Sequence, residues 1–242
     1  MRISAEAQAP GTAKKKINFD DLLTAVGNAW KKIDHQHRSS IKQTEGIVGE
    51  LGELLDTTHV LFVFCSPKDE GQLRVAGEFR TIQECLGRSA ANKRILVHPL
   101  PAATATDFRR ELLNKHYDIV HFAGHADGES LVFEDEKGNA TTVSLEALRD
   151  AVKRKPSIRV VILNACQAGR YLTSAIAPFT IAMSDEIDDD AAIEFTRGFY
   201  DALALGRSMP DAYQEGLTAV KFAGFETERI QLITDPACSG DQ

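Results

Sequence analysis

Two reactive side chains, the imidazole of His125 and the thiol of Cys166, each follow an apolar run that is typical of a buried strand. The first run covers residues 117–124 and the second covers residues 158–165. In a mainly parallel sheet, reactive groups collect beyond the carboxyl ends of the strands. If these two strands are parallel neighbours, an imidazole and a thiol that are remote in sequence come within reach of each other.

This pair of groups is suited to acyl transfer by a cysteine nucleophile. A free thiol is only slightly ionised at neutral pH, so an imidazole that takes its proton makes it a much better nucleophile. Small residues allow a substrate backbone to approach and leave main-chain N–H groups free to bind an oxyanion. Such residues flank both positions, namely Ala123, Gly124, Ala126 and Gly128 near the histidine and Ala165, Ala168 and Gly169 near the cysteine.

A packing role is the alternative for each of these residues. A cysteine at the end of a strand is often simply a small core residue. His121 lies inside the first apolar run, and we predict that it is structural, either within the core or bonded to a backbone group. Composition and spacing alone leave both interpretations of Cys166 open.

The elements that would position the pair form a repeated alternation of strands and helices. This alternation predicts an α/β fold with a mainly parallel sheet and helices on both faces. A hairpin is predicted over 131–144 and an edge strand near 229–233. Strands are predicted over 59–66, 94–100, 117–125, 158–166 and 179–184, and helices over 73–87, 105–115, 145–154, 189–204 and 208–223.

The N-terminal part of the chain has a different pattern. Residues 1–16 are small, polar and then basic, and we interpret them as a disordered leader. Two apolar stripes of helical spacing separated by a polar break predict a helical hairpin over 17–56. This hairpin is either a packing extension of the main domain, which we place at 58–242, or a module that binds a partner or a second copy.

Composition excludes several classes of function. The net charge of −7 argues against non-specific nucleic-acid binding, and no apolar stretch is long enough to span a membrane. The N-terminus lacks the apolar region of a secretory signal, so we expect a cytoplasmic protein with reduced thiols. The cysteines show no metal-ligand spacing, and no metal or other cofactor is predicted; they are Cys65, Cys85, Cys166 and Cys238.

The segments "IVHFAGH" and "LNACQAG" resemble the two active-site motifs of caspase-like cysteine proteases, the group that includes caspases, separases and gingipains. The resemblance is closer to bacterial CHAT domains. Residues 178–213 are similar to the CHAT pattern of a strand, an acidic turn and helices, and residues 60–82 to its first strand and helix. The resemblance spans roughly residues 58–236 and implies a caspase-like fold.

The resemblance also implies roles for individual residues. His125 would be the general base and Cys166 the nucleophile, and the pair often acts in this family without a carboxylate. The backbone N–H groups of Cys166 and Ala126 would bind the oxyanion. The family usually has glycine at the position of Ala126, and a left-handed conformation there would strain an alanine by about 1–2 kcal/mol.

The acidic turn "SDEIDDD" follows the predicted strand 179–184. In caspase-like folds this loop lines the pocket for the residue before the cut. Carboxylates of Asp185 and Glu186 there would favour a basic substrate residue through charge-assisted pairs. Residues 188–190 begin the next predicted helix, and we expect them to cap its free N–H groups.

The resemblance implies an endopeptidase that makes limited cuts in a partner protein. In bacteria, relatives of this kind act in defence or programmed cell death and cut a pore-forming or toxin precursor. A regulatory protein could then bind residues 17–56. Two alternatives stay open: a scaffold that keeps the fold without cutting, and an acyltransferase or amidase that uses the same pair on a small substrate.

Overall fold

The computed structural model describes residues 57–71, 74–88 and 95–236, together with Thr24, Asn28, Lys31 and Lys32. The chain divides into two units, Met1–Leu55 and Asp56–Gln242. In the first unit the four described residues are helical. The leader predicted over 1–16 and, apart from these four positions, the hairpin predicted over 17–56 lie outside the described residues. Both stay predictions.

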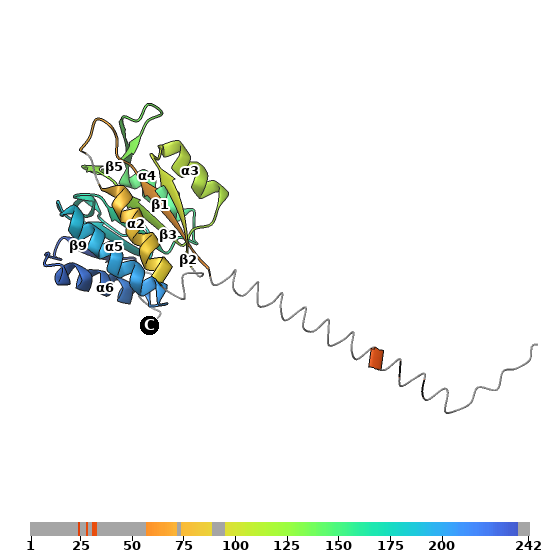
Figure 1. The fold of residues 1–242 in the computed structure, drawn as a ribbon. Coiled ribbons are helices and arrows are strands. Elements are labelled where there is room, and N and C mark those ends of the chain that lie inside the picture. The colour runs from red at the N-terminus through yellow and green to blue at the C-terminus, as the bar shows by residue number, and fades with distance from the viewer. Residues whose placement is uncertain are drawn as a thin grey trace, which may run out of the picture. The chain divides into compact units, whose positions relative to one another are not determined.

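The second unit is built on a six-stranded sheet with the order β2-β1-β3-β7-β8-β9. Five neighbouring strands run parallel, and the edge strand β9 pairs antiparallel with β8. The predicted α/β fold with a mainly parallel sheet is therefore confirmed (Figure 1). The strands are β1 (Thr58–Phe64), β2 (Ile95–Pro101), β3 (Ile119–Ala123), β7 (Val160–Asn164), β8 (Phe179–Met183) and β9 (Ile230–Thr234).

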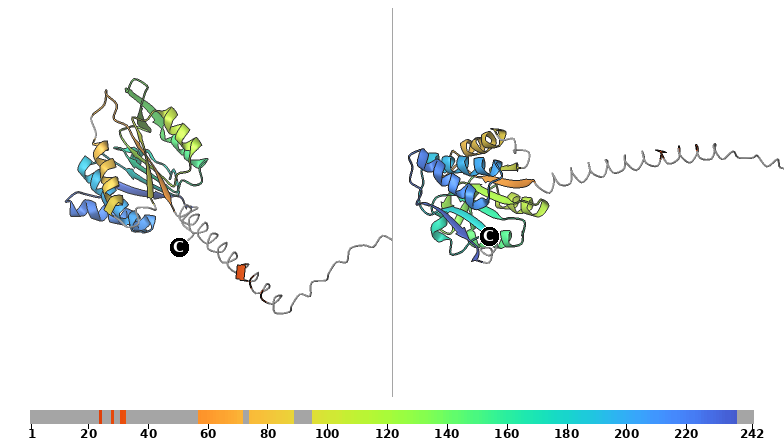
Figure 2. Two further views of the ribbon diagram at one scale, coloured as in Figure 1. Left: turned by 45° about the vertical axis from the view of Figure 1, so that its right-hand side comes forward. Right: turned by 90° about the horizontal axis from the view of Figure 1, so that it is seen from below.

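Helices cover both faces of this sheet, as Figures 1 and 2 show. Alternate side chains of β1 enter different cores: Val60 and Phe62 belong to one apolar cluster, and Leu61 and Val63 belong to another. Burial on both faces explains why the strands have continuous apolar runs. One face is covered by α2 (Val75–Arg88), α5 (Asp189–Ala204) and α6 (Met209–Phe222), and the other by α3 (Ala105–Asn114) and α4 (Leu145–Lys153).

The helices begin at side-chain caps that the sequence supplies. Ser144, Asp188 and Ser208 each accept a hydrogen bond from a backbone N–H in the first turn of α4, α5 and α6, respectively. The cap at Asp188 fixes the start of α5 directly after the acidic turn that follows β8. The first residue of α5, Asp189, therefore follows the last residue of β8, Met183, after only a short turn.

A small antiparallel sheet with the order β4-β5-β6 stands beside the main one. Its strands are β4 (Ala126–Asp127), β5 (Ser130–Glu134) and β6 (Ala140–Ser144). The pairing of β5 with β6 confirms the hairpin predicted over 131–144. The two-residue strand β4 and the 3-10 helix η2 (Ala168–Tyr171) are too short for a sequence pattern to predict. In the described ranges, no helix is both long and apolar enough to cross a bilayer.

Candidate active site

The strands β3 and β7 bring His125 and Cys166 to the same edge of the sheet. They are parallel neighbours, and Ala123 and Asn164 form the last Cα pair of their register. The N–H of the next residue, Gly124, donates to the carbonyl oxygen of Asn164 at 3.2 Å. His125 and Cys166 each lie two residues beyond that last pair. The predicted side-by-side arrangement of the two strands is therefore present.

Cys166 is half-buried and lines a small pocket. The next residue, Gln167, has a φ of 64°, a left-handed backbone conformation that is unusual for a residue other than glycine. Strained backbone of this kind clusters at functional sites. No sequence signal marks it, because glutamine does not favour this conformation. The other residues that line the pocket are Arg74, Val75, Glu78, Gly124, Asn164, Ile187, Asp189, Ala192 and Ile193.

The imidazole of His125 is also half-buried, and Gly71 holds it from one side. Its Nε2 atom lies 2.6 Å from the carbonyl oxygen of Gly71. A carbonyl oxygen only accepts, so Nε2 carries the hydrogen and Nδ1 keeps a lone pair. The neutral ring thus has Nδ1 as its basic atom, although His125 is not among the residues that line the Cys166 pocket. Sequence reasoning missed Gly71, since a backbone carbonyl has no residue signature.

Ala126 begins β4 and pairs with Leu131 of β5. Val132 donates its N–H to the carbonyl oxygen of His125 at 3.0 Å, which makes the Ala126–Leu131 pair a non-hydrogen-bonded one. The N–H of Ala126 therefore points away from β5 and is left free by the ladder. Among the described residues other than glycine, only Ala102 and Gln167 have a positive φ, so the strain considered for Ala126 does not arise.

A buried polar network extends from the pocket between the sheet and its helices. The Oε1 atom of Glu78, a residue only 4% exposed, accepts hydrogen bonds from Asn164 Nδ2 and Thr196 Oγ1, both at 2.7 Å. The Nε2 atom of His121 lies 2.9 Å from the same oxygen without an aligned hydrogen bond. His121 is fully buried, as predicted, and its Nδ1 lies 3.1 Å from the Tyr200 hydroxyl.

The charge of Glu78 also affects this hydroxyl. Burial and, secondarily, the negative charge of Glu78 raise the pKa of Tyr200 well above its ordinary value, so the hydroxyl stays protonated. It can therefore donate to His121 Nδ1, which leaves the hydrogen of this ring on Nε2, the atom 2.9 Å from the Glu78 oxygen. The network joins α2, β3, β7 and α5. Two of its members, Glu78 and Asn164, line the same pocket as Cys166.

The carboxylates of the acidic turn have different partners. Asp188 caps α5 by accepting the N–H of Asp190 at 2.8 Å, as predicted for this part of the turn. Asp189 lines the Cys166 pocket. The side chain of Asp190 forms an ion pair with Arg74, at the start of α2.

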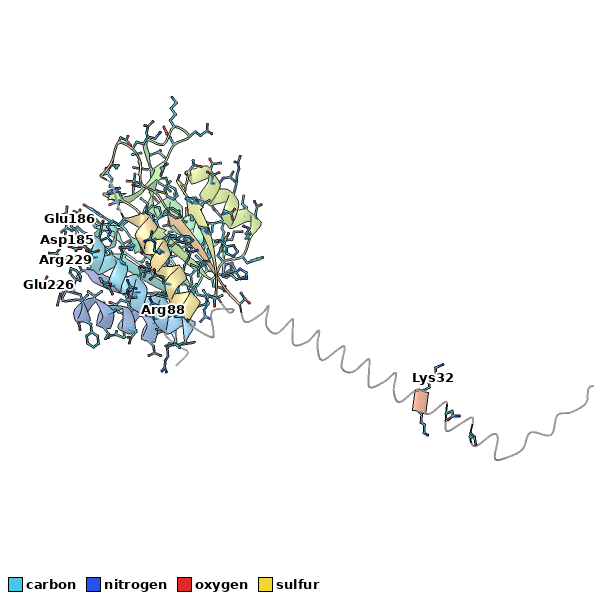
Figure 3. All side chains as sticks on the ribbon, in the orientation of Figure 1. Lys32, Arg88, Asp185, Glu186, Glu226 and Arg229 are labelled. Carbon is cyan, nitrogen blue, oxygen red and sulfur yellow. The ribbon has the colours of Figure 1, made fainter. Side chains whose placement is uncertain are left out.

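Asp185 and Glu186, which the sequence suggested as substrate-binding residues, lie on one side of the molecule near Arg229 (Figure 3). The carboxylate of Asp185 lies 3.6 Å from Arg170, and the backbone carbonyl of Glu186 accepts a hydrogen bond from Arg229 at 2.6 Å. Neither residue lines the Cys166 pocket. Their role in substrate binding stays a prediction.

The other described thiols differ from Cys166 in their surroundings. Cys65 and Cys85 are buried, and burial raises the pKa of each to about 12. Their Sγ atoms approach the backbone carbonyls of Ala103 and Arg197, at 3.5 Å and 3.6 Å. Both are therefore poor nucleophiles at neutral pH. No cluster of three or more potential metal ligands occurs among the described residues.

Residues 35–220 match the protein family described as the CHAT domain. No curated protein matches the chain. Among solved structures, the chain is similar to the Arg-specific cysteine proteinase gingipain R, with a TM-score of 0.48 and 12% identity, over 74% of this chain and 46% of that one. It is also similar to caspase-1 from Spodoptera frugiperda, with a TM-score of 0.48 and 10% identity, over 74% of this chain and 84% of that one.

Proposed function

The chain belongs to the CHAT-domain family, and from this premise we propose that it is a cysteine endopeptidase with His125 and Cys166 as its catalytic pair. The observation that carries the proposal is their common position, two residues beyond the last Cα pair of β3 and β7. Two further observations support it: the thiol is half-buried at the wall of a pocket, and the Nε2–H of the imidazole is held by Gly71.

In this mechanism the Nδ1 atom of His125 takes the proton of the Cys166 thiol. The thiolate attacks the carbonyl carbon of the substrate and forms a tetrahedral intermediate. The imidazolium then gives its proton to the leaving amine as the C–N bond breaks, and a thioester remains. A water molecule, deprotonated by the same imidazole, hydrolyses the thioester and restores the thiol. The hydrogen bond to Gly71 keeps the ring in one orientation through both steps.

The negative oxygen of the intermediate needs hydrogen-bond donors that are already in place. We assign this role to the backbone N–H groups of Cys166 and Ala126. The left-handed conformation of Gln167 determines the direction of the backbone immediately after Cys166. The pairing of β4 with β5 determines the direction of the backbone after His125. Alanine at position 126 is compatible with donation, because the N–H is the same as that of glycine.

The family suggests a protein as the substrate. We propose limited cleavage of a partner, such as a pore-forming or toxin precursor in bacterial defence or programmed cell death, with a cytoplasmic location. Residues 17–56 are the candidate segment for a regulatory protein. The test is to incubate the chain with candidate precursors and to sequence the N-termini of the fragments.

The matched control is Cys166→Ala, which we expect to abolish cleavage while changing the free energy of unfolding by less than about 1 kcal/mol, since the thiol is only half-buried. Thermal unfolding of both proteins checks the second expectation. Fragments that persist with Cys166→Ala, or global unfolding of that variant, would contradict the proposal.

One observation favours a scaffold as the second candidate: the His125 imidazole does not line the pocket that Cys166 lines. A scaffold would bind its partner without cutting it. The partner would then stay intact with both the natural chain and Cys166→Ala. An acyltransferase or amidase with the same pair would instead act on a small substrate and produce no peptide fragments.

A further inference from the structure

An ion pair between Arg74 and Asp190 links the N-terminus of α2 with the N-terminus of α5 beside the Cys166 pocket. Arg74 immediately precedes α2 and accepts the first N–H bonds of that helix at its carbonyl, from Gly77 and Glu78. Its guanidinium bonds to the carboxylate of Asp190, in the first turn of α5. Arg74 lines the pocket itself, and so does Asp189, the neighbour of Asp190.

Helix stability does not explain the position of Arg74. A cation at the N-terminus of a helix is unfavourable, because the backbone N–H groups there already carry partial positive charge. The two side chains are 62% and 59% exposed, and exposed pairs of this kind contribute little to stability. Stability therefore does not account for a cation at this position in the lining of the Cys166 pocket, and a functional role is the alternative.

The pocket has the chemistry of a site for a long basic side chain. Val75, Ile187 and Ile193 supply apolar walls, against which the methylene groups of lysine or arginine can pack. The carboxylate of Asp189 lines the pocket, and that of Asp190, which does not line it, pairs with Arg74, which does. Arg74 now pairs with Asp190, and the remaining cavity of about 40 Å³ has room for water molecules but not for a lysine or arginine side chain.

We propose that Asp190 determines specificity by binding the basic side chain of the substrate residue before the cut, and that Arg74 occupies its place in the free protein. This inference rests on the proposed peptidase function. A substrate guanidinium or ammonium replaces the Arg74 guanidinium at the same carboxylate, so one weak pair is exchanged for another. Because Arg74 occupies this carboxylate, a substrate without a basic residue before the cut binds weakly. A substrate with a basic residue binds more slowly, since it must first displace Arg74.

The test compares two peptides that differ only in the residue before the cut, arginine or its uncharged isostere citrulline. For the full chain we expect a preference for arginine, measured as the ratio of kcat/KM values. Asp190→Asn should lower this ratio about threefold, because one exposed ion pair of modest strength is lost. Arg74→Ala should raise kcat/KM for the arginine peptide about fivefold, through KM, because the competing pair is removed.

The matched control is Arg88→Ala. Arg88 lies in the last turn of the same helix, is labelled in Figure 3, and forms a comparably exposed pair with Glu84 at 3.8 Å. We expect it to leave both peptides unchanged. An Asp190→Asn variant that keeps the preference would overturn the inference. So would an Asp185→Asn variant that alone abolishes the preference, since Asp185 would then be the specificity residue.

A binding measurement separates this inference from the peptidase proposal. Agmatine, which carries a guanidinium and no carboxylate, is titrated calorimetrically into full-length chains that carry Cys166→Ala. We expect it to bind the variant that also carries Arg74→Ala and to lose this binding on adding Asp190→Asn. If agmatine binds in this way but no peptide is cut, the subsite stands and the peptidase proposal fails. Absence of agmatine binding to the Arg74→Ala variant overturns the subsite, whether or not peptides are cut.

Discussion

The carboxylate of Glu78 shows how much one buried residue contributes at this site. One of its oxygens accepts two hydrogen bonds and lies beside His121, within an almost solvent-free space. Glu78→Ala leaves Asn164 and Thr196 without an acceptor, so we expect a loss of about 3 kcal/mol in the free energy of unfolding. Denaturant titration measures it.

The control for this variant is Glu84→Ala on the same helix, where the carboxylate is 45% exposed and makes only long ion pairs with Arg88 and Arg197. A change within about 0.5 kcal/mol is expected there. Equal losses for the two alanine variants would contradict the role of Glu78 as the centre of the network.

At the same scale, sequence reasoning proposed His125 and Cys166 because each follows a long apolar run and has a reactive side chain. It could not point to Gly71, whose backbone carbonyl bonds to the His125 ring, or to Gln167, whose backbone is left-handed. It also missed Glu78, since a glutamate within a helical stripe is usually solvent-exposed. For Ala126 it considered a strain that the chain avoids by pairing in β4.

Among the elements, α5 and α6 pack closely through two glycines. A methyl group added at Gly198 would lie 2.5 Å from the carbonyl oxygen of Glu215, and one added at Gly216 would lie 2.6 Å from the ring of Phe195. Gly198→Ala is therefore expected to force the helices apart and to cost about 1–3 kcal/mol. Thermal and denaturant unfolding check this expectation.

Gly87→Ala is the matched helical control, because a methyl group there meets no atom within 4 Å. It should leave stability unchanged or raise it by about 0.5–1 kcal/mol, since alanine favours the helix more than glycine does. A Gly198→Ala variant as stable as the natural chain would show that the two helices can separate without loss.

The elements themselves were predictable to a large extent. Runs such as 117–124 are mostly apolar because both faces of the strand are covered, and the helices between them carry apolar stripes and polar caps. The missed elements, β4 and η2, are set by their surroundings: β4 exists only by pairing with β5, and η2 follows the left-handed turn at Gln167. A periodic pattern needs more residues than either contains.

On the scale of the whole molecule, stability should depend on pH through the edge strand β2. The ring of His98 stacks on that of His59 in β1, with a centroid distance of 5.4 Å. Burial, and then the neighbouring His59 and Lys115, lower the pKa of His98 below its ordinary value. Below that ordinary value the unfolded chain binds a proton more readily than the folded one, so stability is lost as the pH falls from about 7.5 to about 5.5.

His98→Gln removes this difference in proton binding. We therefore expect the denaturation midpoint of the variant to fall less over the same pH interval than that of the natural chain, with similar midpoints near neutral pH. Parallel curves for the two proteins would contradict the contribution of His98. The comparison concerns the sheet edge and not the Cys166 pocket, so it is independent of any peptidase activity.

The reactivity of Cys166 tests the account most directly. The natural chain and His125→Ala are each treated with a thiol-directed peptidyl ketone, and labelling is followed at every cysteine by mass spectrometry. We predict that Cys166 is labelled well before Cys65 and Cys85, whose buried thiols resist ionisation, and that His125→Ala removes this advantage. Equal labelling of Cys166, Cys65 and Cys85, or unchanged labelling of Cys166 in His125→Ala, would contradict a thiol activated by His125.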